Sequence, residues 1–228
     1  MKKLLFILFA LTALTALTAL TAVKASDWAN LARYSEHNRY VLKKDSSCRR
    51  VVLMGNSITD NWASMDTAFF VRNGFVGRGI SGQVTAQMKE RFYDDVVALA
   101  PDKVVLLCGT NDIAENDGAY NEDKTFGNIV AMVETAKNNG IMPYLSTVLP
   151  VYVYPWNKAI ADVPQKIDSL NKRIIKYGEA NGITVIDYFS AMVAEDGFSL
   201  REEYCYDGVH PNLTGYFVME KILLDALK

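Results

Sequence analysis

Short apolar runs alternate along the chain with stretches in which apolar residues recur at helical spacing. The runs are five to eight residues long and rich in valine, leucine and isoleucine, a pattern typical of buried strands. They occupy residues 50–54, 75–79, 103–108, 141–148 and 183–187. We expect one β-strand at each run.

The segments between these runs predict helices. Met88, Phe92, Val96 and Leu99 fall on one face of residues 84–99. Further helices are expected over residues 27–43, 126–138, 167–180 and 213–227. Asn-Gly pairs end two of them, at positions 139–140 and 181–182.

Alternation of strands and helices predicts parallel βαβ units. The expected fold is therefore a three-layer α/β/α sandwich around a central, mainly five-stranded parallel sheet. No internal repeat or linker interrupts residues 26–228, so we expect one domain there. In such sheets ligands bind beyond the carboxyl ends of the strands.

Residues 1–25 are predicted to be a secretory signal peptide. The chain starts with two lysines, residues 4–23 are apolar, and a small-residue cleavage site ends at Ala25. A transmembrane anchor is the alternative, because about 20 apolar residues can span a bilayer. The cleavage site favours export to the periplasm or beyond, with no stable membrane anchor after cleavage.

Cleavage would change the charge balance of the protein. It lowers the number of basic residues from 24 to 21 against 26 acidic residues, so the net charge becomes about −5. This charge argues against nucleic acid and anionic membrane as partners.

Four short motifs occur in a fixed order. They are GNSIT at 55–59, GISG at 79–82, GTND at 109–112 and DGVHP at 207–211. Three of them directly follow an apolar run. Together they supply a serine, backbone N–H donors, an asparagine amide and an Asp/His pair, the groups needed to attack an ester carbonyl and to hold the resulting oxyanion.

On these motifs the chain resembles the SGNH hydrolase superfamily, the GDSL-type esterases and lipases. The likeness extends from Gly55 to Pro211, essentially the whole predicted domain. Residues 55–62, GNSITDNW, resemble the branch of platelet-activating-factor acetylhydrolase and carbohydrate acetylesterases. The resemblance implies a flavodoxin-like SGNH fold and an ester hydrolase without a metal or organic cofactor.

The resemblance also implies a role for each motif residue. Ser57 would be the nucleophile, His210 the general base, and Asp207 the group that orients His210. The oxyanion hole would consist of the backbone N–H groups of Ser57 and Gly82 and the side-chain amide of Asn111. If the histidine must be neutral, the rate should rise as the pH increases from the acid side.

Each of these residues also has a structural interpretation. Ser57 could cap the helix after it, Asn111 is common in turns, and residues 207–211 form a typical helix entry. The family usually has aspartate at the positions of Asn56 and Gln83. These two replacements predict a different hydrogen-bond network around the serine loop.

Residues 77–82, GRGISG, also match the G-x-G-x-x-G dinucleotide fingerprint. The fingerprint normally follows the first strand, whereas this segment follows the second. Asp102 lies at about the expected distance but before a strand instead of at its end. We therefore reject a dinucleotide site.

Four further residues are candidates for substrate binding. Tyr152, Tyr154 and Trp156 follow the fourth strand and could stack on sugar rings, and Gly79 begins the second motif, where it would permit a sharp turn. The alternative for the aromatic residues is a packed loop. An exported carbohydrate-binding module without activity is the non-enzymatic alternative, although it would not need Ser57 with an Asp/His pair.

The cysteines and histidines carry no metal signature. Cys48, Cys108 and Cys205 match no zinc spacing, and His37 is the only histidine besides His210. We expect three free, mostly buried thiols, with a bridge from Cys108 to Cys205 as the alternative.

The sequence thus predicts an exported serine esterase that removes short acyl groups, acetyl foremost, from a small-molecule or carbohydrate ester. A lysophospholipase or thioesterase that acts on longer acyl chains is the alternative within the same chemistry.

Overall fold

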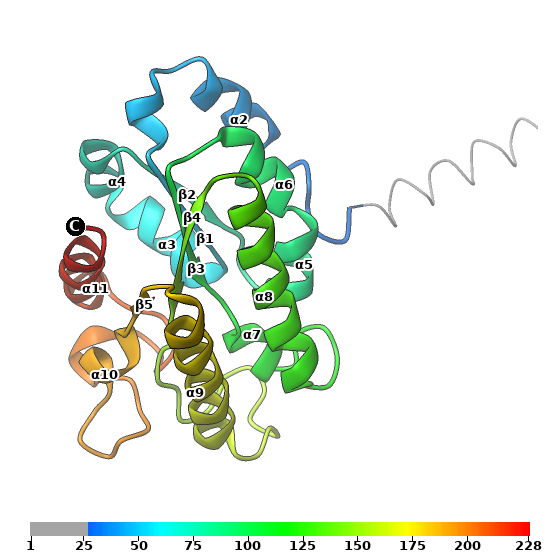
Figure 1. The fold of residues 1–228 in the computed structure, drawn as a ribbon. Coiled ribbons are helices and arrows are strands. Elements are labelled where there is room, and N and C mark those ends of the chain that lie inside the picture. The colour runs from blue at the N-terminus through cyan, green and yellow to red at the C-terminus, as the bar shows by residue number, and fades with distance from the viewer. Residues whose placement is uncertain (1–26) are drawn as a thin grey trace, which may run out of the picture.

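Five parallel strands form the centre of the molecule in the order β2-β1-β3-β4-β5 (Figure 1). They are β1 (Val51–Gly55), β2 (Phe75–Gly79), β3 (Lys103–Leu107), β4 (Met142–Ser146) and β5 (Val185–Ile186). The computed structural model describes residues 27–228, so the predicted signal peptide lies outside the described residues. The predicted α/β/α sandwich with a five-stranded parallel sheet is confirmed.

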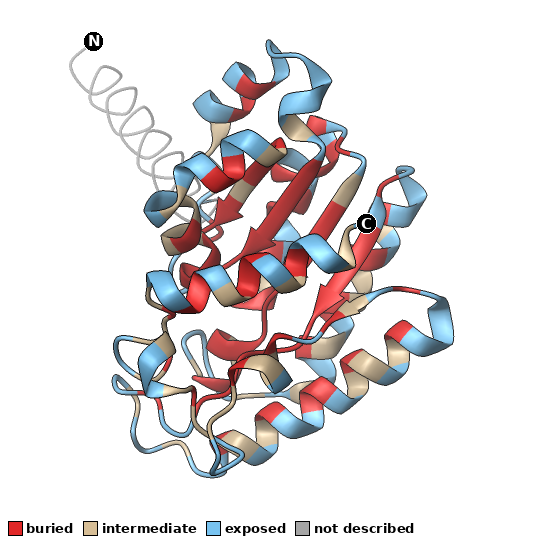
Figure 2. Ribbon diagram, turned by 90° about the vertical axis from the view of Figure 1, so that its left-hand side faces the viewer, coloured by how far each residue is buried: buried red, intermediate tan, exposed pale blue. Residues whose placement is uncertain are grey.

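Successive strand residues point into two separate cores. Val52 and Met54 of β1 belong to the core on one face, whereas Val51 and Leu53 belong to the core on the other. This alternation follows from the two-residue period of a strand. Because both faces are covered, β1 is buried throughout and β3 and β4 are buried after their first residue (Figure 2).

The main helices on the first face contribute their apolar residues to the first core (Figure 1). They are α5 (Thr85–Glu90), α6 (Phe92–Asp95), α8 (Glu122–Asn138) and α9 (Val163–Asn181). Asn121 begins α8 by accepting a hydrogen bond from the Lys124 N–H, and Gly182 ends α9 in the left-handed conformation.

Four other helices cover the second face: α3 (Ser57–Met65), α4 (Thr67–Asn73), α10 (Tyr188–Met192) and α11 (Leu213–Ala226). Trp62 lies at their centre, 1% exposed and stacked between the rings of Phe69 and Tyr216. Its indole N–H donates to Glu220 of α11, so α3 and α11 are held together at a fixed distance.

Two helix predictions need correction. Residues 84–99 form α5, α6 and the 3-10 turn η2 (Val97–Leu99) instead of one helix, although all four predicted apolar residues are buried. The break falls at Arg91, whose guanidinium turns inward onto the ends of β1 and β2. Residues 27–43 contain only one α-helix, α2 (Ser35–Leu42), preceded by turns.

Several short elements were not predicted. They are α4, α10, α7 (Thr110–Ile113) and the 3-10 turns η1 (Ser46–Arg49) and η3 (Glu202–Tyr204). Each has too few residues for a periodic pattern to emerge. In the described part of the chain, no helix combines the length and apolarity needed to cross a membrane.

The strand register brings the motifs to one edge of the sheet. Gly55, the last residue of β1, lies beside Gly79 of β2 and Leu107 of β3. Ser57, Gly82 and Asn111 follow these three strand ends. The topology therefore gathers them beyond the carboxyl ends of the strands, as expected for this fold class.

Candidate active site

Ser57 is the first residue of α3, and hydrogen bonds of the residues around it fix the start of this helix. Asn56 caps the helix, its side chain accepting a hydrogen bond from the Ile58 N–H at 3.1 Å. Tyr216 of α11 donates to the carbonyl of Ile58 at 2.8 Å. Ser57 is only 9% exposed, and it lines an open cleft.

Gly79 lets α3 approach β2 and is not among the residues that line the cleft beside Ser57. A Cβ at Gly79 would lie 2.1 Å from the Asp60 nitrogen and 2.6 Å from the Asn56 carbonyl oxygen, so no side chain fits. Its φ is not positive, and the residue is buried at the end of β2. Gly79 is thus a packing residue, contrary to the sequence-based assignments to substrate binding and to a sharp turn.

His210 connects Ser57 to Asp207. The Ser57 Oγ lies 3.0 Å from His210 Nε2, and His210 Nδ1 lies 2.8 Å from Asp207 Oδ2. The other carboxylate oxygen, Oδ1, accepts the backbone N–H groups of Val209 and His210 at 2.9 and 2.8 Å. The local turn therefore holds the carboxylate in line with the imidazole.

The surroundings of Asp207 keep its carboxyl ionised. Partial burial by itself raises the pKa of Asp207, but hydrogen bonds from the His210 ring and from the two backbone N–H groups outweigh it and lower the pKa. The carboxylate can therefore accept a hydrogen bond from Nδ1–H, which leaves the unprotonated Nε2 to face the serine hydroxyl.

Gly82 and Asn111 belong to the same cleft as His210. Ser57, Gly82, Asn111 and His210 line one open cleft of about 360 Å³. Gly82 has a φ of +80°, a conformation that favours glycine, and a Cβ there would have no neighbour within 4 Å. Asn111 is 2% exposed and donates one amide hydrogen to the Gln83 carbonyl at 2.9 Å, which leaves its second N–H for a ligand.

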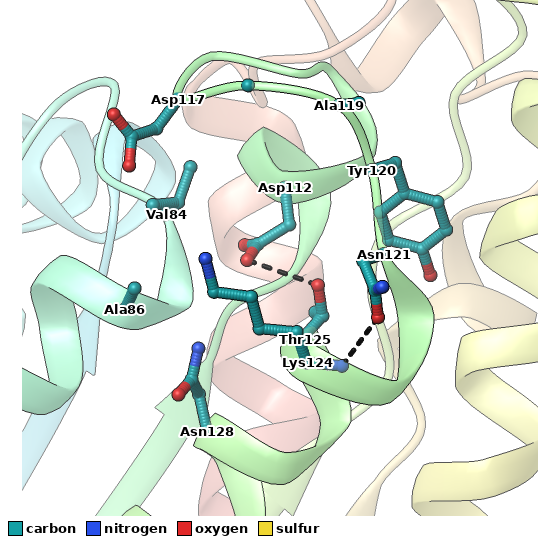
Figure 3. A pocket seen from close by; sticks show the side chains of 11 residues that line it. Val84, Ala86, Asp112, Asp117, Ala119, Tyr120, Asn121, Lys124, Thr125 and Asn128 are labelled. Carbon is teal, nitrogen blue, oxygen red and sulfur yellow. Dashed lines mark hydrogen bonds between the residues drawn. The ribbon is translucent and has the colours of Figure 1, made fainter.

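Asp112 anchors the loop that carries Gly82. It accepts the backbone N–H of Thr85 and the hydroxyl groups of Thr85 and Thr125, and with Lys124 and Asn128 it borders a small cavity of about 40 Å³ (Figure 3). Burial raises its pKa, and these hydrogen bonds partly oppose the increase. Asp112 thereby ties the start of α5 to the turn after β3.

A network of buried hydrogen bonds around Arg91 also supports the loop that carries Gly82. Arg91, 0% exposed, donates to the carbonyls of Gly55 and Arg78 at 2.9 and 3.0 Å and to the side chains of Gln83 and Asp95 at 2.6 and 2.9 Å. Burial lowers the pKa of Arg91, although Asp95 favours its charged form. Gln83, where the resembled family usually has aspartate, thus serves as a neutral acceptor.

The three aromatic residues after β4 separate in space. Trp156 lines the cleft, its ring 6.0 Å from that of His210. Tyr154 is 0% exposed and its hydroxyl bonds to Thr110 at 2.9 Å, so it is a packing residue and the prediction of a substrate contact is wrong. Tyr152 is 63% exposed and is not among the residues that line the cleft.

Three cleft residues were missed by the sequence reasoning: Asn61, Ser81 and Asn116. Asn61 follows the serine motif by two residues and Ser81 lies inside the second motif, so their positions could have indicated them. Asn116 carries no such signal, since it lies on a polar loop outside every motif.

The cysteines remain unpaired among the described residues. Cys108 is buried, Cys205 is partly exposed and Cys48 is exposed, so the expectation that most would be buried is wrong. His37 lies at the surface and contacts Arg78, away from the cleft. Within residues 27–228, no cluster of three or more His, Cys, Asp or Glu side chains is arranged to hold a metal ion.

The fold and the sequence both have known relatives. A protein from Bacteroides fragilis, provisionally named an acylhydrolase, is 50% identical and has a TM-score of 0.85, covering 88% of this chain and 97% of its own. A GDSL-like lipase from Bacteroides thetaiotaomicron is 47% identical with a TM-score of 0.84, covering 87% and 97%. An acetylxylan esterase from Xylanibacter ruminicola is 23% identical over 219 residues, 78% of this chain and 43% of that protein.

The chain spans less than half the length of the curated relatives that it matches. The family model described as GDSL-like Lipase/Acylhydrolase matches residues 53–217, which include all four motifs. This chain belongs to the GDSL-like lipase/acylhydrolase family and is a carboxylic ester hydrolase.

Proposed function

We propose that this protein is an exported serine esterase that removes short acyl groups, acetyl foremost, from carbohydrate esters. The observation that carries the proposal is the continuous contact from Ser57 through His210 to Asp207, with 3.0 and 2.8 Å between the facing atoms. This relay opens into a cleft that also contains Gly82 and Asn111.

The geometry supports a two-step reaction. His210 Nε2 accepts the Ser57 proton as Oγ attacks the ester carbonyl, and Asp207 stabilises the imidazolium that forms. The N–H groups of Ser57, Gly82 and Asn111 would hold the oxyanion. His210 then gives the proton to the leaving alcohol, and a water molecule, deprotonated by His210, releases the acid and restores Ser57.

The lining of the cleft favours a sugar as part of the substrate. Its lining combines amide side chains with a single large ring, that of Trp156, which is 46% exposed. An exposed indole beside hydrogen-bonding amides is suited to a sugar ring, which has apolar faces and hydroxyl edges. Similarity to the acetylxylan esterase of Xylanibacter ruminicola supports the same substrate class.

Export is part of this proposal. It rests on residues 1–25, which have the charge and apolarity of a signal peptide. Partial similarity to a lipoprotein from Bacillus subtilis, 33% over 76 residues, agrees with an exported location.

Hydrolysis of p-nitrophenyl esters from acetate to long-chain acyl groups tests the chemistry, with Ser57→Ala as the control. We expect turnover to fall with acyl length and to vanish in the variant. Acetate release from acetylated xylooligosaccharides then tests the substrate class. Turnover by the Ser57→Ala variant would contradict the assignment of the nucleophile.

One observation favours the alternative of longer acyl chains. An apolar groove of about 530 Å³ between α2 and α4 is lined by Phe70 and Val71, and Asp60 borders it. Asp60 also accepts a hydrogen bond from Ser81, which lines the catalytic cleft. A long acyl chain would have to cross this contact, and faster turnover of long-chain esters than of acetate would favour that alternative.

A further inference from the structure

Asn116 lies on the loop after α7, and its backbone is tied to the turn that carries Asn111. Its N–H donates to the Asn111 carbonyl at 3.1 Å. The preceding residue, Glu115, has a φ of +59°, which turns the chain back toward the cleft. Asn116 is therefore placed at a defined distance from the oxyanion side of the site, although its side chain is exposed.

The side-chain amide of Asn116 donates one hydrogen bond and accepts another. Its Nδ2 donates to the Gly82 carbonyl at 3.2 Å, and its Oδ1 accepts the Trp156 indole N–H at 3.0 Å. A flipped amide would place oxygen against oxygen and N–H against N–H. The two partners therefore fix the amide in one orientation.

The conformation of the loop at Gly82 depends on hydrogen bonds to its backbone carbonyls. Nothing packs where a Gly82 side chain would lie, and the residue is exposed with a φ of +80°. Two consecutive carbonyls hold the loop instead: that of Gly82 bonds to Asn116 and that of Gln83 bonds to Asn111. Without Asn116, one of these two restraints is lost.

We propose that Asn116 is a positioning residue that holds the oxyanion glycine and the Trp156 ring in one fixed relation. The inference rests on the proposed function, which assigns Gly82 to the oxyanion and Trp156 to the sugar. A donor to the oxyanion contributes to the rate only when its direction is set before the reaction. The Asn116 amide thus aligns two parts of the site: the Trp156 ring, which would bind the sugar, and the Gly82 N–H, which would bind the carbonyl oxygen of the ester.

The variant Asn116→Asp tests the two hydrogen bonds separately, because it removes the bond to Gly82 and keeps the bond to Trp156. The variant keeps an oxygen for the Trp156 N–H but places a second oxygen, without a proton, against the Gly82 carbonyl. We expect kcat to fall roughly 10- to 100-fold with p-nitrophenyl acetate and with an acetylated xylooligosaccharide, and the KM for p-nitrophenyl acetate to stay within about twofold. A loss in kcat without a change in KM is the signature of a misplaced transition-state contact.

Two further variants isolate the cause. Ala119→Asp adds the same charge to the same loop without touching either bond, and kcat should not change. Trp156→Phe keeps a ring and leaves the Asn116–Gly82 bond, so it should raise the KM for the sugar ester and reduce kcat less than Asn116→Asp does. Asn116→Ala, which removes both bonds, should reduce kcat and raise the KM for the sugar ester.

Wild-type kcat in both Asn116→Asp and Asn116→Ala, with melting temperatures equal to that of the parent protein, would overturn the inference. An equal loss in Ala119→Asp would also overturn it, because charge alone would then explain the effect. Turnover that survives Ser57→Ala would instead contradict the proposed function, so the two failures are distinguishable.

Discussion

The two sides of the catalytic cleft are held in different ways. On one side, Asp207 and His210 are three residues apart, and the turn between them supplies most of their hydrogen bonds. On the other side, Gly82 and Asn111 follow different strands. The loop of Gly82 is held by the side chains of Asn111, Asp112 and Asn116, which lie 27 to 34 residues from their partners in sequence. The proposed proton-transfer side is thus a local structure, whereas the proposed oxyanion side depends on tertiary packing.

This difference predicts how each side fails. Damage to the local side should abolish chemistry and leave folding intact, because Asp207 and His210 are partly exposed and support no core. Damage to the buried part of the oxyanion side should affect rate and stability together, because Asn111, Gln83 and Arg91 are buried. The following variants test that distinction.

Asp207→Asn should have the largest effect on rate. The substituted amide would present N–H to His210 Nδ1 and favour the wrong tautomer, so kcat should fall about 10⁴-fold. The melting temperature at neutral pH should decrease only slightly, because the variant loses the small contribution of the ionised carboxylate. Asp196→Asn is the matched control, because Asp196 also accepts backbone N–H groups in an exposed turn; equal kcat values for the two variants would contradict the role of Asp207.

Asn111→Ala should cost less in rate but more in stability. Loss of one oxyanion donor typically lowers kcat about 10²–10³-fold. The Gln83 carbonyl also loses its partner, so the free energy of unfolding should decrease. Asn128→Ala removes an amide that donates to Thr85 outside the cleft; if it reduced kcat as much, the effect of Asn111 would be structural only.

Asp95→Asn should act mainly on stability. Asp95 is the only carboxylate paired with the buried Arg91 guanidinium in the described residues, and the variant leaves that charge uncompensated. Breaking a buried pair in this way typically costs about 3–5 kcal/mol. Chemical denaturation of this variant beside Asp94→Asn, an exposed neighbour, measures the difference, and equal unfolding free energies would show that Arg91 does not need Asp95.

The smallest predicted effect is a change in the stability of the fold at acid pH. The folded-state pKa of Asp207 lies below its ordinary value, so its ionised form stabilises the fold at pH values above about 4. That contribution is lost as the pH falls through the folded-state pKa. The difference in melting temperature between the parent protein and Asp207→Asn, measured from pH 6 to pH 2, should therefore shrink in acid. A constant difference would contradict the lowered pKa.

The same contrast explains what the sequence could predict. The strands and both core faces follow from periodic apolar residues such as Val52 and Met54, and the Asp207–His210 pairing needs only a three-residue turn. The roles of Asn116 and Arg91 could not be predicted. Asn116 bonds to Gly82 and Trp156, 34 and 40 residues away, and Arg91 bonds to the Gly55 carbonyl, 36 residues away, and no periodic pattern records such contacts. Tyr154 and Trp156 are both aromatic and lie two residues apart, yet only the tertiary fold decides that Tyr154 is buried and Trp156 is exposed.

Covalent labelling with a fluorophosphonate, followed by mass spectrometry of the digested protein, tests the central claim most directly. The reagent reacts with a serine hydroxyl only when a base activates it. We predict one equivalent of label on Ser57 in the parent protein and none in His210→Ala of the same fold and stability. Label on another residue, or unchanged labelling of Ser57 without His210, would contradict the proposed relay.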